Sequence, residues 1–280
     1  MAERNDIVNF SNDYIDLMET SLKVSKEFKN EHTPCCIIIS TITMIADLKK
    51  EISISDFKEC PTWTTEALGL GMEIGTKENT KKVKRTFFNQ ITIRYKDHIS
   101  QKSIKIFSNG RLQMTGITSV HEAKKIVTIV SGCLAMNSKV YKPVTLDLDN
   151  ILQIAMINSN FCLNHGLNIV KLQNCIMEHK ANGQIPDHVV YEPDVYPGLK
   201  IKYKGTHLFV FSTGNVVITG AKSIENIKNS YTYINNILLN NWDYVKSSFH
   251  TKLFKSKSKN EYINGYPVSV HNACLSVTSM

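Results

Sequence analysis

The hydrophobic pattern of this chain occurs twice. The segment SIKIFSNGRLQMTGITS at 103–119 matches HLFVFSTGNVVITGAKS at 207–223 almost position for position, with Gly110 and Gly214 in the same place. In each copy, alternating apolar and polar residues flank a glycine-containing turn, which predicts a β-hairpin. A helix is expected after each hairpin, because Ser119 begins a capping-box pattern and the second copy is followed by apolar residues at helical spacing. The pattern therefore predicts two copies of one unit in which a helix follows a hairpin.

Further strands are predicted upstream of each hairpin. Residues 36–44 and 154–162 match one another as apolar strands, and 87–95 matches 196–203. A repeat of about 100 residues is too long for one unit of a solenoid. We therefore expect a pseudo-symmetric pair of α+β halves.

Two extensions flank these halves. Phe10, Tyr14 and Leu17 lie at helical spacing near the N-terminus, and the last residues carry lysines among serines. The predicted organisation is an N-terminal helical extension, a first repeat with an insertion, a second repeat and a mobile basic tail: 1–32, 33–140 with 61–86 inserted, 141–245 and 246–280.

The alternation within the hairpins assigns side chains to two faces of a sheet. Each half supplies only enough helix to cover one face, and the second face is expected to stay uncovered. The face expected under the helices comprises Ile104, Ile106, Leu112 and Met114, and Leu208, Val210, Val216 and Ile218. The opposite face comprises Lys105, Phe107, Arg111, Gln113 and Thr115, and Phe209, Phe211, Val217 and Thr219. An uncovered apolar face with basic residues beside it predicts a surface that binds a partner.

Composition narrows the class of protein. The 280 residues include 33 Lys and Arg against 25 Asp and Glu, a net charge of +8 that permits nucleic acid as the partner. No apolar run approaches the roughly 18 residues that a transmembrane helix needs, so we expect no membrane partner. The seven cysteines, which include the adjacent pair Cys35 and Cys36, favour reduced thiols and an intracellular location.

The chemistry-bearing motifs are sparse. The motif that contains Cys162 and His165, followed by Cys175 and His179, resembles a set of zinc ligands. However, Cys162 is expected at a strand end and Cys175 on the following helix, and the spacing between the pairs is short for a zinc finger. We therefore expect cysteines in the core, with no metal and no cofactor. The sequence contains no P-loop, nucleophile elbow or His-Glu-x-x-His, so an enzyme is not expected.

These segments resemble the TATA-box-binding protein family. The second half carries YEPDVYPGL at 191–199 and FVFSTGNVVITGAKS at 209–223, and the first carries IISTIT at 38–43 and KIFSNGRLQMTG at 105–116. The resemblance covers roughly 33–245 and implies a saddle. In that fold a curved antiparallel sheet has helices on its convex side, and its underside widens and kinks the DNA minor groove.

The resemblance also implies roles for individual residues, each at the matching position of this sequence. The wedges that unstack base steps would be Phe88, Phe107, Tyr196 and Phe211. The groove floor would be Ile37, Ile39, Thr41, Thr115, Ala155, Ile157, Ser159, Val217 and Thr219. The phosphate contacts would be Arg94, Arg111, Lys202 and Lys222. The stirrup that docks a TFIIB-like partner would be Glu192, Asp194 and Val195.

The chain departs from the family at several of these positions. Tyr196 replaces a phenylalanine, and Lys105 and Gln113 replace apolar floor residues. The family's two groove asparagines align with Ile37 and Ala155, so the alignment predicts that hydrogen-bond donors are lost from the centre of the floor. A saddle that keeps its shape but lacks hydrogen-bond donors would recognise DNA by how easily the sequence deforms.

The resemblance implies a general transcription initiation factor, monomeric on DNA. Such a protein binds and bends A·T-rich promoter DNA and recruits a TFIIB-like factor and the RNA polymerase machinery. The expected location is the nucleus or a viral transcription compartment, and the divergence favours a large DNA virus as the source. The alternative is a protein-interaction module, a saddle that has lost most DNA binding and tethers or sequesters transcription factors.

Overall fold

A computed structural model describes residues 10–28, 34, 36–58, 71–74, 89–96, 101–163, 165–181, 186–247, 262–263 and 266–267. Phe88 lies outside the described residues. So do the insertion 61–86, apart from 71–74, and the C-terminal tail after 247, apart from the two dipeptides.

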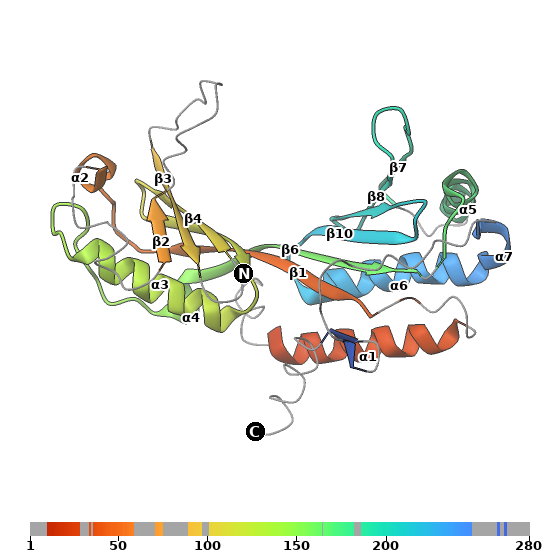
Figure 1. Ribbon diagram of the computed structural model, residues 1–280, viewed down its shortest axis with the longest axis horizontal. Coiled ribbons are helices and arrows are strands. Elements are labelled where there is room, and N and C mark those ends of the chain that lie inside the picture. The colour runs from red at the N-terminus through yellow and green to blue at the C-terminus, as the bar shows by residue number, and fades with distance from the viewer. Residues whose placement is uncertain are drawn as a thin grey trace.

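Ten of the described strands form one antiparallel sheet, in the order β2-β3-β4-β5-β1-β6-β10-β9-β8-β7. The first half contributes β1 (Ile38–Asp47), β2 (Gly71–Ile74), β3 (Gln90–Lys96), β4 (Gln101–Phe107) and β5 (Arg111–Ile117). The second half contributes β6 (Leu152–Cys162), β7 (His188–Val190), β8 (Leu199–Tyr203), β9 (Thr206–Val210) and β10 (Asn215–Ala221). A separate pair joins β11 (Tyr262–Ile263) to β12 (Tyr266–Pro267). The sheet curves, and the long helices lie along one side of it (Figure 1).

The described helices are α1 (Phe10–Glu27), α2 (Ile54–Lys58), α3 (Val120–Ala135), α4 (Leu148–Ile151), α5 (Ile169–Ala181), α6 (Ile224–Asn240) and α7 (Trp242–Val245). The predicted capping box is confirmed at α3, where the Ser119 hydroxyl accepts from the Glu122 N–H at 3.1 Å. The Glu122 carboxylate accepts in return from the Thr118 N–H at 2.8 Å. The Ser223 hydroxyl caps α6 in the same way, accepting from the Asn226 N–H at 3.3 Å.

The pseudo-twofold axis passes between the two central strands. Ile42 of β1 and Ile157 of β6 are register partners, and each also pairs with the end of its own hairpin, Ile117 or Ala221. The central strands therefore correspond with an offset of 115 residues. The sequence match of 36–44 to 154–162 implied 118 and is wrong by three, because short apolar strands look alike in any register.

The core lies between the sheet and the helices, and the predicted division of faces is confirmed. Ile104, Ile106, Leu112 and Met114 are all fully buried, as are their counterparts Leu208, Val210, Val216 and Ile218. Residues of the opposite face are half-buried or exposed, including Lys105, Phe107, Phe209 and Phe211. The chain is thus an α+β protein with a curved antiparallel sheet and helices on its convex side.

The N-terminal helix adds a second layer outside α6 (Figure 1). The Ser21 hydroxyl donates to the Tyr231 hydroxyl at 3.2 Å, and Lys228 pairs with Asp16 at 2.7 Å. The same serine accepts the backbone N–H of Ile37 at 3.1 Å, which ties the entry into β1 to this layer.

Candidate nucleic-acid interface

The helix-free face of the sheet is built from cross-strand rows of side chains. In the second half, one row runs from Lys200 through Phe209 and Val217 to Asn160. The equivalent row of the first half runs from Lys105 through Gln113 to Ile45. Register partners share a face, so each row crosses the underside of its own half. The two halves differ chemically, because aromatic and aliphatic groups of the second stand where the first has an ammonium and an amide.

Three aromatic rings gather on the helix-free face of the second half. The Tyr196 ring lies edge-on to Phe209, with centroids 5.6 Å apart, and to Phe211 at 5.9 Å. The Lys200 ammonium lies 4.7 Å from the centre of the Tyr196 ring, a cation–π contact. The structure therefore brings together two of the predicted wedges, Tyr196 and Phe211, and adds Phe209 to them.

Gly198 provides the space for this aromatic cluster. A Cβ atom at Gly198 would lie 2.8 Å from the Tyr196 ring and 2.9 Å from the Phe211 ring. Real Cβ atoms do not approach that closely, so any larger residue would displace one of the two rings. The glycine of the YPGL segment is thus a steric requirement of the paired rings.

Phe107 is the corresponding ring of the first half. It ends β4, is half-buried, and stands opposite the helix-facing Ile106, as predicted. Its carbonyl accepts the N–H of Gly110, which turns the chain with a φ of +82°, a backbone conformation that favours glycine. Its expected partner, Phe88, lies outside the described residues.

Part of the predicted groove floor is wrong. Ile37, Ile157 and Ser159 are 1%, 0% and 0% exposed under the helices, and Ile39 also packs against the core. In β1, a register irregularity at Ser40 reverses the alternation, so Ile37 and Ile39 before it face the helices. In β6, the alignment was displaced by three residues, and an odd displacement moves every side chain to the opposite face.

The floor residues that do reach the helix-free face are Thr41, Thr115, Val217 and Thr219. Ala155 is half-buried and is the extra residue at a second register irregularity, between the pairs of Thr43 and Met44. Thr43 and Asn158 are further members of this face, because Thr43 pairs with Thr115 and Asn158 pairs with Thr41.

Asn158 is the residue that sequence reasoning missed. Its side-chain amide donates to the Thr41 hydroxyl at 3.0 Å, and its carbonyl oxygen accepts from the Thr219 hydroxyl at 2.5 Å. This triad joins β1, β6 and β10 at the centre of the floor. The expectation that the centre lacks hydrogen-bond donors is therefore wrong. The alternation of the strand could have identified it. Ile157 and Phe161 are large apolar residues on the core side, so Asn158, which has the opposite parity, must face away from the core.

The triad of Asn158, Thr41 and Thr219 retains hydrogen-bond donors that it does not use internally. An asparagine amide has two N–H groups, and one of them serves Thr41. The Thr41 hydroxyl, used there as an acceptor, keeps its own O–H as a donor. At A·T base pairs the minor groove offers acceptors, adenine N3 and thymine O2. The centre of this face thus has the hydrogen-bonding polarity that such a groove would satisfy.

The predicted phosphate contacts are distributed over both halves of the chain. Arg111, Lys202 and Lys222 are exposed, and Arg94 is half-buried on β3. Arg111 stands opposite Asp47 in the β1–β5 register. The pKa of Asp47 is lowered by a hydrogen bond from the Lys49 backbone N–H and, to a lesser extent, by the charge of Arg111. Arg111 is therefore already close to an acidic group of its own chain.

The predicted stirrup projects between β7 and β8 (Figure 1). The Val195 and Tyr196 N–H groups both donate to the Glu192 carbonyl, at 3.0 and 2.8 Å, which closes a tight turn. Glu192 and Asp194 are exposed, and the Val195 side chain is 77% exposed. An apolar side chain held this far into solvent, in a turn that also carries two exposed carboxylates, is available for contact with another molecule.

The cysteine and histidine motif does not form a metal centre. Cys175 is buried in α5, and the buried His165 ring packs edge-on against Trp242 at 5.7 Å. Within the described ranges, no three His, Cys, Asp or Glu side chains are arranged to hold a metal ion. Nor does any described helix have the length and hydropathy to cross a membrane.

Known proteins similar to this chain were found by sequence. The family described as transcription factor TFIID, or TATA-binding protein (TBP), matches residues 151–241. A TATA-box-binding protein-like protein of Acanthamoeba polyphaga mimivirus is 26% identical over 282 aligned positions, covering 88% of this chain and 76% of the viral protein. The TATA-box-binding protein of Thermoplasma volcanium is 27% identical over 129 positions, covering 45% of this chain and less than two thirds, 62%, of the archaeal one.

A comparison of structures found the TBP of Methanococcus jannaschii. The match covers 73% of this chain and 98% of that chain, with 17% sequence identity and a TM-score of 0.47. The sequence similarities coincide with a duplicated α+β unit whose hairpins and capped helices recur in both halves. Over most of its length the chain is therefore similar to a TATA-box-binding protein-like protein of a mimivirus, and residues 151–241 match the TATA-binding protein family.

Proposed function

We propose that the helix-free face binds double-stranded DNA through its minor groove and bends it, as a transcription initiation factor acting on A·T-rich promoters. The observation that carries this proposal is the cluster of Tyr196, Phe209 and Phe211 beside a floor of threonines and Asn158, on a face that the described helices leave open. Rings at a floor edge can unstack a base step, and a wider groove then contacts more of the sheet.

The charge distribution supports this assignment. Lys200 and Lys202 lie on the same face as the aromatic cluster, next to one another on β8, and Lys105 occupies the floor of the first half. Cations at these positions would neutralise phosphates on either side of a groove pressed against the floor. Such contacts set affinity and salt dependence.

Direct measurement of binding and bending tests the proposal. Wild-type protein is titrated into end-labelled A·T-rich and G·C-rich duplexes at several salt concentrations, with mobility shift for affinity and energy transfer for the bend. We expect tighter binding and a larger bend on the A·T-rich duplex. Phe211→Ala should lose the bend and about 1–3 kcal/mol of ring stacking. Tyr244→Ala, an exposed ring on α7, is the matched control and should behave as wild type.

One of the arguments for the alternative function, a protein-interaction module with little DNA binding, does not hold. The absence of floor donors favoured it, and Asn158 supplies them. It keeps the polar Lys105 and Gln113 in the first half. If wild-type protein fails to bind either duplex at low salt and still binds a TFIIB-like protein, the module is the correct assignment.

We propose the stirrup at Glu192–Val195 as the docking surface for a TFIIB-like partner in both cases. Val195 supplies an exposed apolar contact in a turn that also carries the exposed Glu192 and Asp194. Val195→Arg should abolish capture of a TFIIB-like factor while leaving DNA bending unchanged, because the Val195 side chain is 77% exposed and takes no part in the ring contacts of the aromatic cluster. Equal capture by the variant and wild type would rule this surface out.

A further inference from the structure

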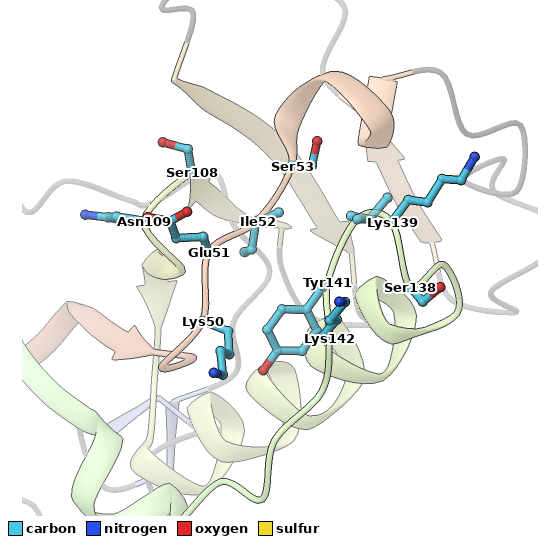
Figure 2. A pocket seen from close by; sticks show the side chains of 11 residues that line it. Lys50, Glu51, Ile52, Ser53, Ser108, Asn109, Ser138, Lys139, Tyr141 and Lys142 are labelled. Carbon is cyan, nitrogen blue, oxygen red and sulfur yellow. The ribbon is translucent and has the colours of Figure 1, made fainter.

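A basic hollow lies at the outer end of the first half, away from the floor and the aromatic cluster. Its volume is about 570 Å3, and three chain segments line it (Figure 2). These are the loop after β1 at 50–53, the β4–β5 turn at 108–109, and the loop after α3 at 138–142.

Backbone hydrogen bonds hold the walls of this hollow in place. The Ile52 N–H donates to the Ser108 carbonyl at 2.8 Å, and the Ser53 N–H donates to the Val140 carbonyl at 2.9 Å. The hydroxyl of the buried Tyr141 donates to the Leu48 carbonyl at 3.1 Å. All three segments are thus joined, and the side chains they carry project from a fixed frame.

Three lysines line the hollow: Lys50, Lys139 and Lys142. Lys50 and Lys142 lie beside the Tyr141 ring, and Lys139 lies on the opposite rim with its ammonium directed away from them (Figure 2). All three are exposed, and Glu51 is the acidic residue among the lining side chains. Among the described residues none of the three lysines forms an ion pair. Ser53, Ser108 and Ser138 also line the hollow, and each carries a hydroxyl group that can donate a hydrogen bond.

The second half shows that the fold itself does not require this hollow. The same hydrogen-bond frame recurs there, from Leu167 N–H to Ser212 carbonyl at 2.9 Å and from Asn168 N–H to Val245 carbonyl at 2.8 Å. A Cβ atom added at Gly110 would clash with the Lys50 carbonyl, and one at Gly214 would clash with the His165 carbonyl, so Lys50 and His165 occupy equivalent positions. Yet His165 is buried against Trp242, whereas Lys50 is exposed.

We propose that this lysine hollow binds a phosphate group. Ammonium groups act on phosphate as mobile point charges, and serine hydroxyls add hydrogen-bond donors. Two sources share this chemistry: a backbone phosphate of a duplex that extends past the first half, and free phosphate or a phosphorylated small molecule. The proposal goes beyond the groove-binding function, because it concerns a surface outside the helix-free face.

The test uses full-length protein in which Lys50, Lys139 and Lys142 are all changed to glutamine. The matched control changes Lys23, Lys26 and Lys125, three exposed lysines on α1 and α3, to glutamine and so removes the same charge. For a duplex source, the pocket variant should lower the slope of log K against log salt by about 0.9 for each DNA phosphate that it no longer neutralises. The bend should be unchanged, and the control should keep the wild-type slope.

For a free source, the probe is inorganic phosphate added at constant ionic strength against chloride. The thermal midpoint of wild type and control should rise with phosphate, and that of the pocket variant should not, because a ligand of the native state stabilises it. If pocket variant and control agree in both assays, the hollow is not a phosphate site. If wild type binds no DNA, the groove-binding function fails, and the phosphate titration still decides the pocket.

Discussion

The Asn158 side-chain amide donates to the Thr41 hydroxyl at 3.0 Å and so bridges the two central strands on the helix-free face. The same asparagine accepts from Thr219 on the neighbouring strand. A hydrogen-bonded triad across three strands fixes the orientation of the remaining amide N–H and of the Thr41 hydroxyl. Pre-oriented donors at the centre of the floor would distinguish A·T from G·C base pairs, which carry a guanine amino group in the minor groove.

Asn158→Ala should therefore lower the preference for an A·T-rich centre by about 1–3 kcal/mol, the value of a good base contact. Competition binding with duplexes that differ only in their two central base pairs measures this preference. Asn174→Ala, at an exposed position on α5, is the matched control. An unchanged A·T preference in Asn158→Ala would show that the triad only braces the sheet.

Gly198→Ala should disrupt DNA bending without unfolding the protein. Its methyl group would meet the Tyr196 and Phe211 rings at less than 3 Å, and the rings can move outward from the exposed face. Gly132→Ala on α3 is the control, since nothing lies within 4 Å of its added methyl group. The control should raise stability by about 0.5–1 kcal/mol through helix propensity. Bend angle and thermal midpoint are measured for both, and a normal bend in Gly198→Ala would contradict the steric argument.

Tyr196→Phe should strengthen binding and increase the bend. The Tyr196 ring already contacts Phe209 and Phe211, and a phenylalanine ring, which lacks only the hydroxyl group, keeps these contacts. A hydroxyl inserted at a base step loses water, and its removal should improve affinity about fivefold, equivalent to about 1 kcal/mol. Titration of the A·T-rich duplex measures this gain. Weaker binding by the variant would indicate that the hydroxyl itself contacts the DNA.

The ion pair between Lys102 and Glu122 is a stability determinant of the first half. Lys102 is 2% exposed, and its ammonium lies 2.5 Å from the Glu122 carboxylate, which also caps α3. Glu122→Gln should cost about 3–5 kcal/mol of unfolding free energy, because it removes the carboxylate charge that faces a buried ammonium. Asp149→Asn, which breaks the exposed pair with Lys124, should cost less than about 1 kcal/mol. Urea denaturation compares the two, and similar losses of stability would contradict this assignment.

Stability should fall in strongly alkaline solution through Tyr233. Burial raises the pKa of Tyr233 to about 12, with a smaller contribution from Tyr203, whose ring stacks on it at 4.0 Å. The neutral form is favoured in the folded state, so this contribution is complete below the unfolded pKa of about 10. It is lost as the pH rises from there through about 12. Tyr233→Phe should flatten this part of the stability curve, measured by urea midpoints between pH 9 and 12. A curve that stays parallel to wild type would exclude Tyr233 as the cause.

Local patterns were sufficient for the hairpins, the capped helices and the division of their faces. Ser119 and Ser223 cap helices where the sequence indicates, and alternation in 103–119 and 207–223 agrees with the burial of every predicted core residue there. These features depend on interactions between residues a few positions apart, so a short window contains their cause.

Local patterns could not identify which residues form the centre of the interface. Ile37, Ile157 and Ser159 were assigned to the floor from a strand alignment, yet each is buried under the helices. An irregularity at one residue, or an offset of 115 in place of 118, reverses which face a side chain occupies. In apolar strands such as 36–44, the local sequence indicates neither the register irregularity nor the correct offset between the repeats.

The sequence alone determined that two α+β units are joined in one chain, which helices cover the hairpins, and which sheet face the described helices leave open. Only the tertiary structure decided that Asn158 stands at the centre of that face, that Phe209 joins the aromatic cluster, and that three lysines gather at one end of the first half. The reason is that cross-strand register and the meeting of distant loops are set by packing between elements, and no periodicity within a segment encodes them.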